Sequence, residues 1–530
     1  MNIFEIIIVL LFLQYFITLP GIFKKAGLTS WHGFIPVLQW LTWLKMLKRP
    51  WYWVFILLVP GVNLLMLTIL NVETGIAFNK RSMKEQWFFG GLPWIALFDL
   101  SFRQKEAEFI GPRDWTNRKK SFQREWGEAI LFAVIAASVI RSFFFEAFTI
   151  PTGSMEGSML VGDYLFVSKM SYGPKIQQTP LSLPFIHNAI PGGMTNSYLE
   201  WIQLPNYRLP GFGDVERYDP VVFNFPHGDS VVAHPSTAGH DYYALLRNVG
   251  KQMAGSPEAY VADKVTYDER AKAYYQKQLK ADIKARPIDK EENYIKRCVA
   301  LPGETIEIRD RQVFLDGEAM ENPDGLQYNY TLKLKNPEMI SKIIEKLGLT
   351  NVDFGQERNG VNYGKVALTQ GEVDQLTALN VVDTMFLESQ ASNQGQLIVF
   401  PNSLQAPYNT WDQDNYGPVT LPAKGKTYDL NLENLPIYER VISVYEGNDL
   451  EVRDGQILIN GEVVTSYTFA QDYYWMMGDN RHNSADSRMW GFVPESHVVG
   501  KAVFTWFSKQ NEAQHGESKI RWDRMFQVPK

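Results

Sequence analysis

The sequence predicts a mixed fold, in which an N-terminal α-helical transmembrane region precedes a mostly antiparallel β domain with α/β insertions. Two observations predict this fold class. Residues 1–148 contain long runs of Leu, Ile, Trp and Phe, whereas from residue 149 onward short apolar strands alternate with Gly, Pro, Asn and Asp. In addition, 530 residues are too many for one ordinary domain, and a hydrophobic content of 45% is sufficient for a sizeable core. We therefore expect at least two structural units.

The composition excludes several classes of function. The formal net charge of −6 gives no basic signature, so we expect no nucleic-acid partner. The single cysteine, Cys298, rules out an intramolecular disulfide framework and is expected to be a small buried strand residue. The eight histidines are scattered without metal-ligand spacing. The sequence therefore predicts no metal centre and indicates no cofactor.

Three apolar runs in the first part of the chain are candidates for membrane spans. Residues 3–22 and 51–70 each approach the ~20 residues that a helix needs to cross the hydrocarbon core. The first run lacks a basic n-region and a cleavage pattern, so we interpret it as a retained span. Residues 87–102 form a shorter run that contains Pro93 and Asp99, which indicates a marginal span or a re-entrant segment.

The fourth apolar run, 127–148, is predicted to be the final transmembrane anchor, with Arg141 near enough to one end to reach the interface. Two strongly basic segments, 24–49 and 103–124, favour the cytoplasmic side. Both lie there if all four runs cross the membrane and the N-terminus is outside. A three-span arrangement stays open, because four spans place the basic residues of 80–84 outside. In both arrangements the last span runs outward, which makes the large C-terminal part extracytoplasmic.

Two segments of the predicted β domain are similar to each other. "TIEIRDRQVFLDGE" from Thr305 and "DLEVRDGQILINGE" from Asp449 share residues at the same offsets, and each is predicted to form strand, turn, strand, turn. An internal repeat and two hairpins of independent origin both remain open. The predicted divisions are a multi-span membrane domain with cytoplasmic basic loops (1–126), the final anchor (127–148), a β core in three parts (149–226, 293–321 and 441–510), two insertions (227–292 and 322–440) and a C-terminal tail (511–530).

The stretch "FTIPTGSMEGSML", 148–160, follows the predicted anchor and contains a candidate nucleophile, Ser154. Gly153 allows the backbone to approach a ligand closely, and Pro151 stiffens the entry. A serine in a Gly-containing turn is more often only a turn residue. Ser154 therefore needs a base from elsewhere in the chain.

A candidate base, Lys296, lies in the strand-like run "NYIKRCVALPGETIEI". A lysine in such a strand usually points to solvent. If it is instead buried beside Ser154, desolvation lowers its pKa, and the neutral amine can take the Ser154 proton as a general base. A Ser-Lys pair is an attested variant of the catalytic triad.

A third segment, "YYWMMGDNRHNSADSRMWGFVP" (473–494), is dense in Asp, Asn, Ser and Arg. Such a loop normally satisfies its own backbone through Asx turns. In the functional interpretation, Ser484 orients the Lys296 amine. The residues expected to brace the site from behind are Asp479, Asp486, Arg488 and Arg297.

These three segments, together with "GDYLFVSKMSYG" and "ERYDPVVFNFP", resemble the bacterial type I signal peptidases, or leader peptidases, in order, wording and distance from the membrane run. The most specific segment is "GDNRHNSADSRMWGFVPESHVVGKA", which is similar to the family's Gly-Asp-Asn-Arg-x-Asn-Ser-x-Asp-Ser-Arg pattern. The resemblance covers about 138–226, 293–320 and 472–508. It says nothing about the two insertions.

The resemblance implies a role for each matching residue. Ser154 matches the acylating nucleophile, Lys296 its general base and Ser484 the serine that hydrogen-bonds the lysine. Thr152 matches the hydroxyl that forms the oxyanion hole with the Ser154 backbone N–H. The residues that match the shallow apolar pockets for small substrate side chains are Phe148, Ile150, Met155, Tyr294 and Ile295.

The resemblance also implies a fold and an activity. We expect a signal-peptidase-like β fold and a membrane-bound serine endopeptidase with a Ser-Lys dyad. It would remove N-terminal signal peptides from exported preproteins at the outer face of the bacterial cytoplasmic membrane. The expected partners are preproteins with Ala-x-Ala sites and membrane lipid, with the secretion translocon as a further candidate.

The chain departs from the family pattern at two places. Where the family commonly has Ser-Met-x-Pro-Thr-Leu, residues 154–159 are Ser-Met-Glu-Gly-Ser-Met, which leaves the pocket shape undetermined. His482 occupies a position that is often acidic in the family.

Two other functions stay open. The first alternative is a self-cleaving repressor of the SOS response, which shares the Ser-Met and lysine arrangement but lacks membrane spans. The second is a catalytically inactive membrane receptor or scaffold.

Overall fold

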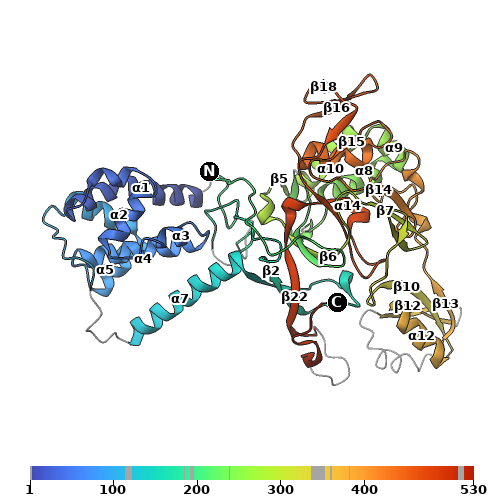
Figure 1. The fold of residues 1–530 in the computed structure, drawn as a ribbon, viewed down its shortest axis with the longest axis horizontal. Coiled ribbons are helices and arrows are strands. Elements are labelled where there is room, and N and C mark those ends of the chain that lie inside the picture. Colours follow the sequence, from blue (N-terminus) through green and yellow to red (C-terminus); the bar gives the residue numbers. More distant parts are fainter. Residues whose placement is uncertain are drawn as a thin grey trace. The chain divides into compact units, whose positions relative to one another are not determined.

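The computed structural model describes residues 3–113, 122–183, 186–190, 196–228, 230–237, 239–335, 352–358, 361–380, 382–510 and 519–529. Part of the second basic segment, three parts of the second insertion (336–351, 359–360 and 381) and part of the C-terminal tail lie outside these ranges. The chain divides into two units, Met1–Phe144 with Ile176–Asn206 and Phe145–Lys175 with Tyr207–Lys530 (Figure 1). We call them the helical unit and the β unit.

The helical unit packs its helices around one apolar core. Its helices are α1 (Ile3–Lys25), α2 (Leu38–Met46), α3 (Trp53–Leu57), α4 (Val62–Ala77), α5 (Met83–Gly91), α6 (Pro93–Phe98) and α7 (Phe122–Phe143), with a π-helical turn over Asp99–Arg103. Trp43, Leu70 and Leu97 are completely buried in this core. α5 begins with a capping box, in which Ser82 and Glu85 each bond the other's backbone N–H.

The second predicted span, 51–70, is not one continuous helix, so this prediction is wrong. α3 and α4 are separated by Pro60, which lacks a backbone N–H, and by Gly61, whose φ is +77°. The third predicted run, 87–102, is likewise divided, because Pro93 starts a new helix after α5 has ended. Both stretches form short helices that contribute to the core of the helical unit.

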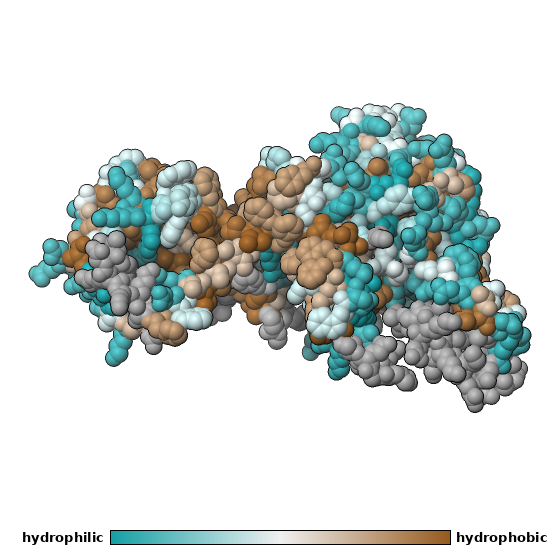
Figure 2. Space-filling model, turned by 60° about the horizontal axis from the view of Figure 1, so that its bottom comes forward, coloured by the Kyte–Doolittle hydropathy of each residue, from teal (hydrophilic) through white to brown (hydrophobic). Residues whose placement is uncertain are grey.

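Among the residues whose side chains the structure describes, α7 alone is long and apolar enough to cross a membrane. The qualifying stretch is Glu125–Phe143, which overlaps the predicted anchor 127–148. Its apolar side chains are exposed, as at Trp126 (57%) and Phe132 (74%). In Figure 2 apolar surface is plentiful on the helical unit, whereas much of the β unit is polar. The multi-pass arrangement remains a prediction.

The β unit is built around a seven-stranded sheet with the order β1-β2-β22-β3-β6-β20-β21. Its strands are β1 (Phe145–Thr149), β2 (Asp163–Ser168), β3 (Pro220–Asn224), β6 (Asn293–Ala300), β20 (Tyr473–Met477), β21 (Val493–Pro494) and β22 (Val498–Ser508). All six neighbouring pairs are antiparallel, which confirms the predicted antiparallel β domain. Cys298 is buried in β6, as expected.

The two similar sequence segments adopt the same three-stranded form, which confirms the predicted hairpins. The first copy is β7 (Thr305–Arg309), β8 (Gln312–Leu315) and β9 (Glu318–Ala319), and the second is β16 (Leu450–Arg453), β17 (Gln456–Ile459) and β18 (Glu462–Val463). In both copies a residue with positive φ, Asp316 or Asn460, accepts the backbone N–H of the first residue through its side chain. The copies differ in burial, since Ile308 is 2% exposed and the matching Val452 is 52% exposed.

The two predicted insertions have separate folds. The first contains α8 (Tyr242–Ala254), α9 (Pro257–Ala262) and α10 (Lys264–Gln278) beside the pair β4 (Val231–Ala233) and β5 (Asp282–Lys284). The second contains the sheet β11-β12-β10-β13, made of β10 (Gln327–Leu334), β11 (Val352–Arg358), β12 (Val361–Thr369) and β13 (Val382–Leu387), with α12 (Gln370–Leu379). It also contains β14 (Tyr416–Thr420), which pairs with β7, so this part of the predicted insertion is integrated into the core.

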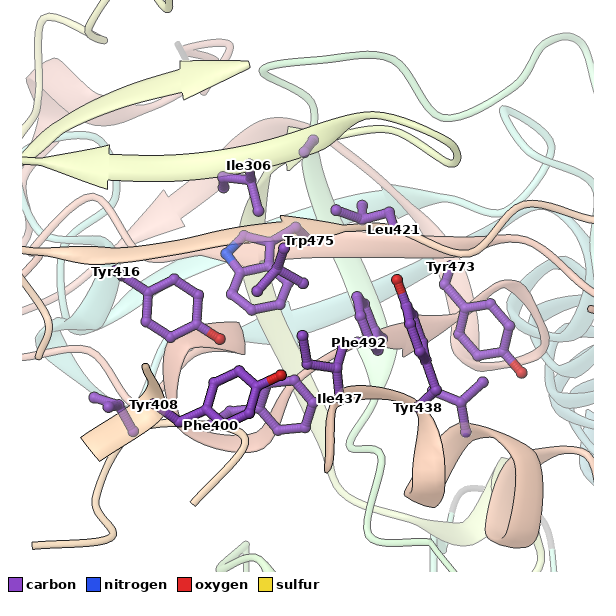
Figure 3. Close-up of a cluster of buried hydrophobic side chains, with 14 of the residues drawn as sticks. Ile306, Phe400, Tyr408, Tyr416, Leu421, Ile437, Tyr438, Tyr473, Trp475 and Phe492 are labelled. Atoms are coloured by element: carbon purple, nitrogen blue, oxygen red, sulfur yellow. The ribbon is translucent and has the colours of Figure 1, made fainter. Parts of the chain in front are cut away.

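A large aromatic core fixes the end of β20. The Trp475 ring of β20 lies 5.5 Å from the ring of Tyr416 and 5.7 Å from that of Phe492, measured between centroids (Figure 3). Phe400 and Tyr438 join the same buried cluster from the second insertion. Aromatic groups of this size dominate the burial energy of a core. The strand that leads into the polar loop is therefore held rigidly.

The difference in burial between the two hairpins predicts a difference in stability. Ile308→Ala should lower the free energy of unfolding by about 2–4 kcal/mol, because it leaves a cavity in the core. The matched change in the exposed copy, Val452→Ala, should alter it by about 0.5 kcal/mol or less. Urea unfolding of the purified protein, followed by tryptophan fluorescence, measures both values. Equal losses in the two variants would contradict the assignment of burial.

Candidate active site

The candidate nucleophile lies in the connection between β1 and β2, which we call the nucleophile loop (150–163). At its neck the N–H of Ile150 donates to the carbonyl of Asp163 (2.9 Å). At its tip a single 3-10 turn over Gly153–Met155 presents the half-buried Ser154. A hairpin connection that closes at its neck holds its tip in a fixed place relative to the sheet.

Lys296 meets Ser154 from the neighbouring part of the sheet. β6 lies between β3 and β20, with Lys296 opposite Val221. A hydrogen bond of 2.7 Å joins Lys296 Nζ to Ser154 Oγ, and Nζ also donates to the carbonyl of Ile295 (3.0 Å). The lysine is only 3% exposed. The solvent-facing orientation that is usual for a strand lysine is therefore excluded, and the structure brings the predicted pair together.

Burial controls the protonation of the Lys296 amine. Desolvation lowers its pKa from 10.5 to about 8, because the charged form loses its hydration. Asp486 and Asp479 act in the opposite direction and raise it. The amine is therefore neutral in a substantial fraction of molecules near neutral pH, which a general base requires.

The polar loop 478–488 holds the nucleophile loop through Asn480. The backbone N–H of Asn480 donates to the carbonyl of Ser154, and its side-chain amide donates to the carbonyl of Gly153, each at 3.1 Å. The side chain is buried. Asn480 thus fixes the backbone on which the candidate nucleophile stands.

Gly478 allows the polar loop to approach this closely. A methyl group at Gly478 would lie 2.3 Å from the Ser484 hydroxyl oxygen and 2.4 Å from the Ser154 carbonyl oxygen, so a larger residue would displace one of them. Ser484 is therefore adjacent to the site and is 3% exposed. Among the described residues, no hydrogen bond joins Ser484 to Lys296. The predicted orienting role of Ser484 stays a prediction.

The four residues predicted to brace the site form two buried ion pairs. Arg297 donates to both carboxylate oxygens of Asp479, at 2.7 and 2.6 Å. Arg488 donates likewise to Asp486, at 2.9 and 2.8 Å. Burial acts to raise the pKa of the Asp486 carboxyl, but the Arg488 guanidinium outweighs it and holds the pKa below its ordinary value. Both carboxylates are thus paired with an arginine.

The departure from the family pattern after the nucleophile has a structural explanation. The hydroxyl of Ser158 donates to Asp479 (2.6 Å) and accepts from Arg297 (3.1 Å), so it joins the nucleophile loop to the first ion pair. Gly157 has a φ of +97°, and a methyl group there would lie 2.1 Å from the carbonyl oxygen of Gly325. The loop therefore packs directly against the backbone of the second insertion.

The second insertion also supports the polar loop. The N–H of Gln327 donates to the carbonyl of Asp479, and the N–H of Arg481 donates to the carbonyl of Gln327, each at 2.9 Å. His482 bonds Asp414 through Nε2 (2.9 Å) and is buried behind the loop. Through their two backbone bonds, Gln327 and the loop form one isolated parallel β-bridge, between Gln327 and Asn480. Gln327, at the start of β10, and Asp414, which follows β13 in the chain, thus both support the polar loop.

Four of the five predicted pocket residues gather in one apolar cluster. They are Phe148, Ile150, Met155 and Ile295. Tyr294 lies in a different cluster, where its ring packs against Phe225 and Trp490 and its hydroxyl donates to the carbonyl of Gly239. Its ring centroid is nevertheless 5.5 Å from the Lys296 amine. Tyr294 therefore borders the dyad rather than the apolar cluster.

Thr152 is the N-cap residue of the turn that carries Ser154. Its backbone is extended, its side chain is exposed, and its hydroxyl does not bond to the turn. The hydroxyl is thus not used to cap the turn. No group of three or more potential metal ligands gathers within the ranges that the structure describes.

Sequence reasoning did not single out Gly478, Asn480 or Ser158. The first two stand in the motif that carried the family resemblance, but their roles are contacts with backbone atoms of a distant segment, which no residue type reveals. Ser158 lies in the nucleophile loop, where residues 154–159 depart from the family's Ser-Met-x-Pro-Thr-Leu pattern. The hydroxyl of Ser158 was the one feature of the sequence that could have indicated its contact with the Arg297–Asp479 pair.

Two family models match the chain. Residues 123–370 and 464–507, more than half of the sequence, match the model described as signal peptidase, peptidase S26. Residues 31–112 match a second model, described as a family of unknown function, DUF5684. The first match includes Ser154, Lys296 and the whole polar loop.

Several curated proteins are similar to the chain over most of its length. Signal peptidase I of Haemophilus influenzae is 26% identical over 398 residues, which are 75% of this chain and 73% of that protein. Signal peptidase I of Buchnera aphidicola subsp. Acyrthosiphon pisum is 23% identical over 404 residues, 74% of this chain and 77% of that protein. Over a shorter stretch of 116 residues, signal peptidase I of Rickettsia massiliae is 35% identical, covering 22% of this chain and 36% of that protein. From the extent of the family match and from these relatives, the chain belongs to the peptidase S26 family of signal peptidases and is a serine peptidase.

Proposed function

We propose that this protein is a membrane-bound serine endopeptidase that uses a Ser154–Lys296 dyad to cleave N-terminal signal peptides from exported preproteins. The observation that carries the proposal is the 2.7 Å hydrogen bond between Lys296 Nζ and Ser154 Oγ, at a position where burial lowers the amine's pKa to about 8. Family membership favours this activity over an inactive receptor or scaffold. The substrates are preproteins with small residues before the cleaved bond.

The dyad can perform both halves of the reaction. Neutral Lys296 takes the Ser154 proton while Oγ attacks the scissile carbonyl carbon, and the resulting ammonium gives its proton to the leaving amine as the C–N bond breaks. The mature protein leaves, and the signal peptide stays attached to Ser154 as an ester. Lys296, neutral again, then takes a proton from water while the water oxygen attacks the ester carbonyl. The lysine passes that proton to Ser154 Oγ as the ester C–O bond breaks, which restores the serine and frees the signal peptide, whose new carboxylic acid ionises in solvent.

Thr152 completes the proposed oxyanion hole. In each half-reaction the carbonyl oxygen becomes negatively charged, and the Ser154 backbone N–H and the Thr152 hydroxyl are the proposed donors. The exposed Thr152 hydroxyl, free of any bond to the turn, supports this assignment. Ser484 is proposed to orient the Lys296 amine once substrate is bound.

The proposed membrane anchor is α7, and it limits where the reaction takes place. Ser154 follows Phe143, the last residue of α7, by eleven residues, so its Cα lies within roughly 40 Å of the helix end along the chain. We place the catalytic part at the outer face of the bacterial cytoplasmic membrane, with lipid and the secretion translocon as partners. Residues 3–22, which lie in the continuous helix α1, are proposed as a further span.

Removal of either dyad residue should abolish processing. Ser154→Ala eliminates the nucleophile, and Lys296→Met eliminates the base while keeping the side-chain volume. Cleavage of a preprotein with an Ala-x-Ala site, followed on a gel, measures the effect. As a matched control, Lys175→Met removes another buried amine, whose pKa is lowered to about 7 by burial, and should keep activity. Full processing by Lys296→Met would sink the proposed mechanism.

The activity should depend on pH through the Lys296 amine. Because only the neutral amine accepts a proton, kcat/KM should fall about tenfold per unit below the lysine's pKa of about 8 and level off above it. Measurement between pH 6 and 10 with a peptide substrate gives the midpoint. The Lys175→Met variant should keep the same midpoint. A rate that declines as the pH rises through 8 would contradict the general-base role.

Thr152→Val should lower kcat by about 10²–10³ with little change in KM, because it removes one oxyanion donor while keeping the shape of the side chain. Thr152→Ser, which restores the hydroxyl, should recover most of the rate. Steady-state kinetics on the same peptide separate kcat from KM. If valine is tolerated at full rate, the oxyanion hole contains no Thr152 hydroxyl.

A further inference from the structure

The C-terminal segment 519–529 runs back along β22 towards the nucleophile loop. The N–H of Phe526 donates to the carbonyl of Thr505 (2.6 Å), and the N–H of Thr505 donates to the carbonyl of Gln527 (2.8 Å). The segment lies outside the stretches that match the signal peptidase family model. It therefore contacts a strand of the matched region from outside that region.

Arg524 of this segment binds the neck of the nucleophile loop. Its guanidinium donates to Asp163 Oδ2 through Nε (3.1 Å) and through Nη2 (2.7 Å), and Nη2 also donates to the carbonyl of Ser158 (3.1 Å). The Asp163 side chain is completely buried. A buried carboxylate requires such a charged partner, and a guanidinium that bonds it twice also fixes its direction.

Asp163, which Arg524 bonds, also contacts other parts of the nucleophile loop. Asp163 Oδ2 accepts the backbone N–H of Leu160 (2.9 Å), and Oδ1 accepts the hydroxyl of Ser508 (2.6 Å). Its backbone carbonyl accepts the N–H of Ile150 at the start of the loop. Arg524 thus bonds the residue at which the two ends of the loop meet, and Arg521 assists it by donating to the carbonyl of Val161 (2.9 Å).

The contact with Ser158 reaches the other support of the loop. The carbonyl of Ser158 accepts from Arg524, while its hydroxyl donates to Asp479, which pairs with Arg297. One residue of the loop therefore joins the C-terminal segment to the ion pair beneath the polar loop. Movement of Arg524 would shift the backbone four residues after Ser154.

We propose that Arg524 is a positioning residue, which holds Ser154 at hydrogen-bond distance from Lys296 by clamping the nucleophile loop at Asp163 and Ser158. The inference rests on the proposed function of the dyad. Arg524 acts on the rate of acylation and not on substrate binding, since it touches the loop from behind. Its effect on kcat should exceed its effect on KM.

The test compares Arg524→Ala and Arg524→Lys in the full-length protein, with kcat and KM measured on one peptide substrate. Arg524→Ala should lower kcat by about tenfold or more with KM within about twofold, because small displacements of reacting groups cost large factors in rate. Arg524→Lys, which keeps the charge but not the double bond to Asp163, should recover part of the loss. The pH midpoint should stay unchanged, because Arg524 does not touch Lys296. Arg524→Ala added to Asp163→Asn should cause little further loss.

The control is Arg453→Ala, which removes an arginine paired with Glu451 on the exposed hairpin and should leave kcat unchanged. Thermal unfolding of every variant separates positioning from folding. Unchanged kcat in both Arg524 variants, a rise in KM alone, or a loss of activity that only tracks a loss of folded protein would each overturn the inference. If Ser154→Ala remains active, the dyad itself is refuted; if Ser154→Ala is inactive and Arg524→Ala is fully active, only the role of Arg524 fails.

Discussion

The candidate site in the β unit is organised around the Lys296 amine, which is buried beside the Ser154 hydroxyl. Lys296 is 3% exposed, and that burial supplies the lowered pKa. Asp479 and Asp486 lie close enough to raise the pKa again, which would leave the lysine charged and unable to act as a base. Each carboxylate is bonded twice by its own arginine, Arg297 or Arg488. The ion pairs therefore do more than stabilise the loop, because they limit the attraction that the carboxylates exert on the ammonium form.

The proposed nucleophile, Ser154, is held by contacts to its backbone rather than to its side chain. Asn480 binds the two carbonyls at the loop tip, Asp163 closes the neck, and Ser158 connects the loop to the ion pair at Asp479. Within the ranges that the structure describes, the Ser154 side chain bonds to Lys296. This division leaves Oγ able to leave the amine and attack a carbonyl while the chain beneath it stays fixed, which is the preorganisation that catalysis requires.

The residues of the candidate site were predictable from the sequence. Most of the contacts that hold these residues in place were not. The residue types of Ser154, Lys296 and the two ion pairs indicated a role in catalysis or in support of the site. The change at residue 149 from long apolar runs to short apolar strands predicted the antiparallel sheet. By contrast, the run 51–70 has the hydropathy of a span, but Pro60 and Gly61 break its helix, and composition averaged over a window does not register a break. Contacts between distant backbones, such as that of Gly478 with Ser154, depend on tertiary structure alone.

The close packing of Gly157 against Gly325 has a consequence for any attempt to shorten this enzyme. Deleting the whole of 322–440 would remove a surface against which the loop bearing the nucleophile rests, together with the strand β14 that pairs with β7. The sheet of β10 to β13, by contrast, has its own small core around Leu332 and Leu376. The part of the second insertion that does not support the candidate site is thus the sheet of β10 to β13 with α12, beyond Asn329 and up to Leu387. The stretches of chain that lead into this sheet and out of it belong to the architecture of the site.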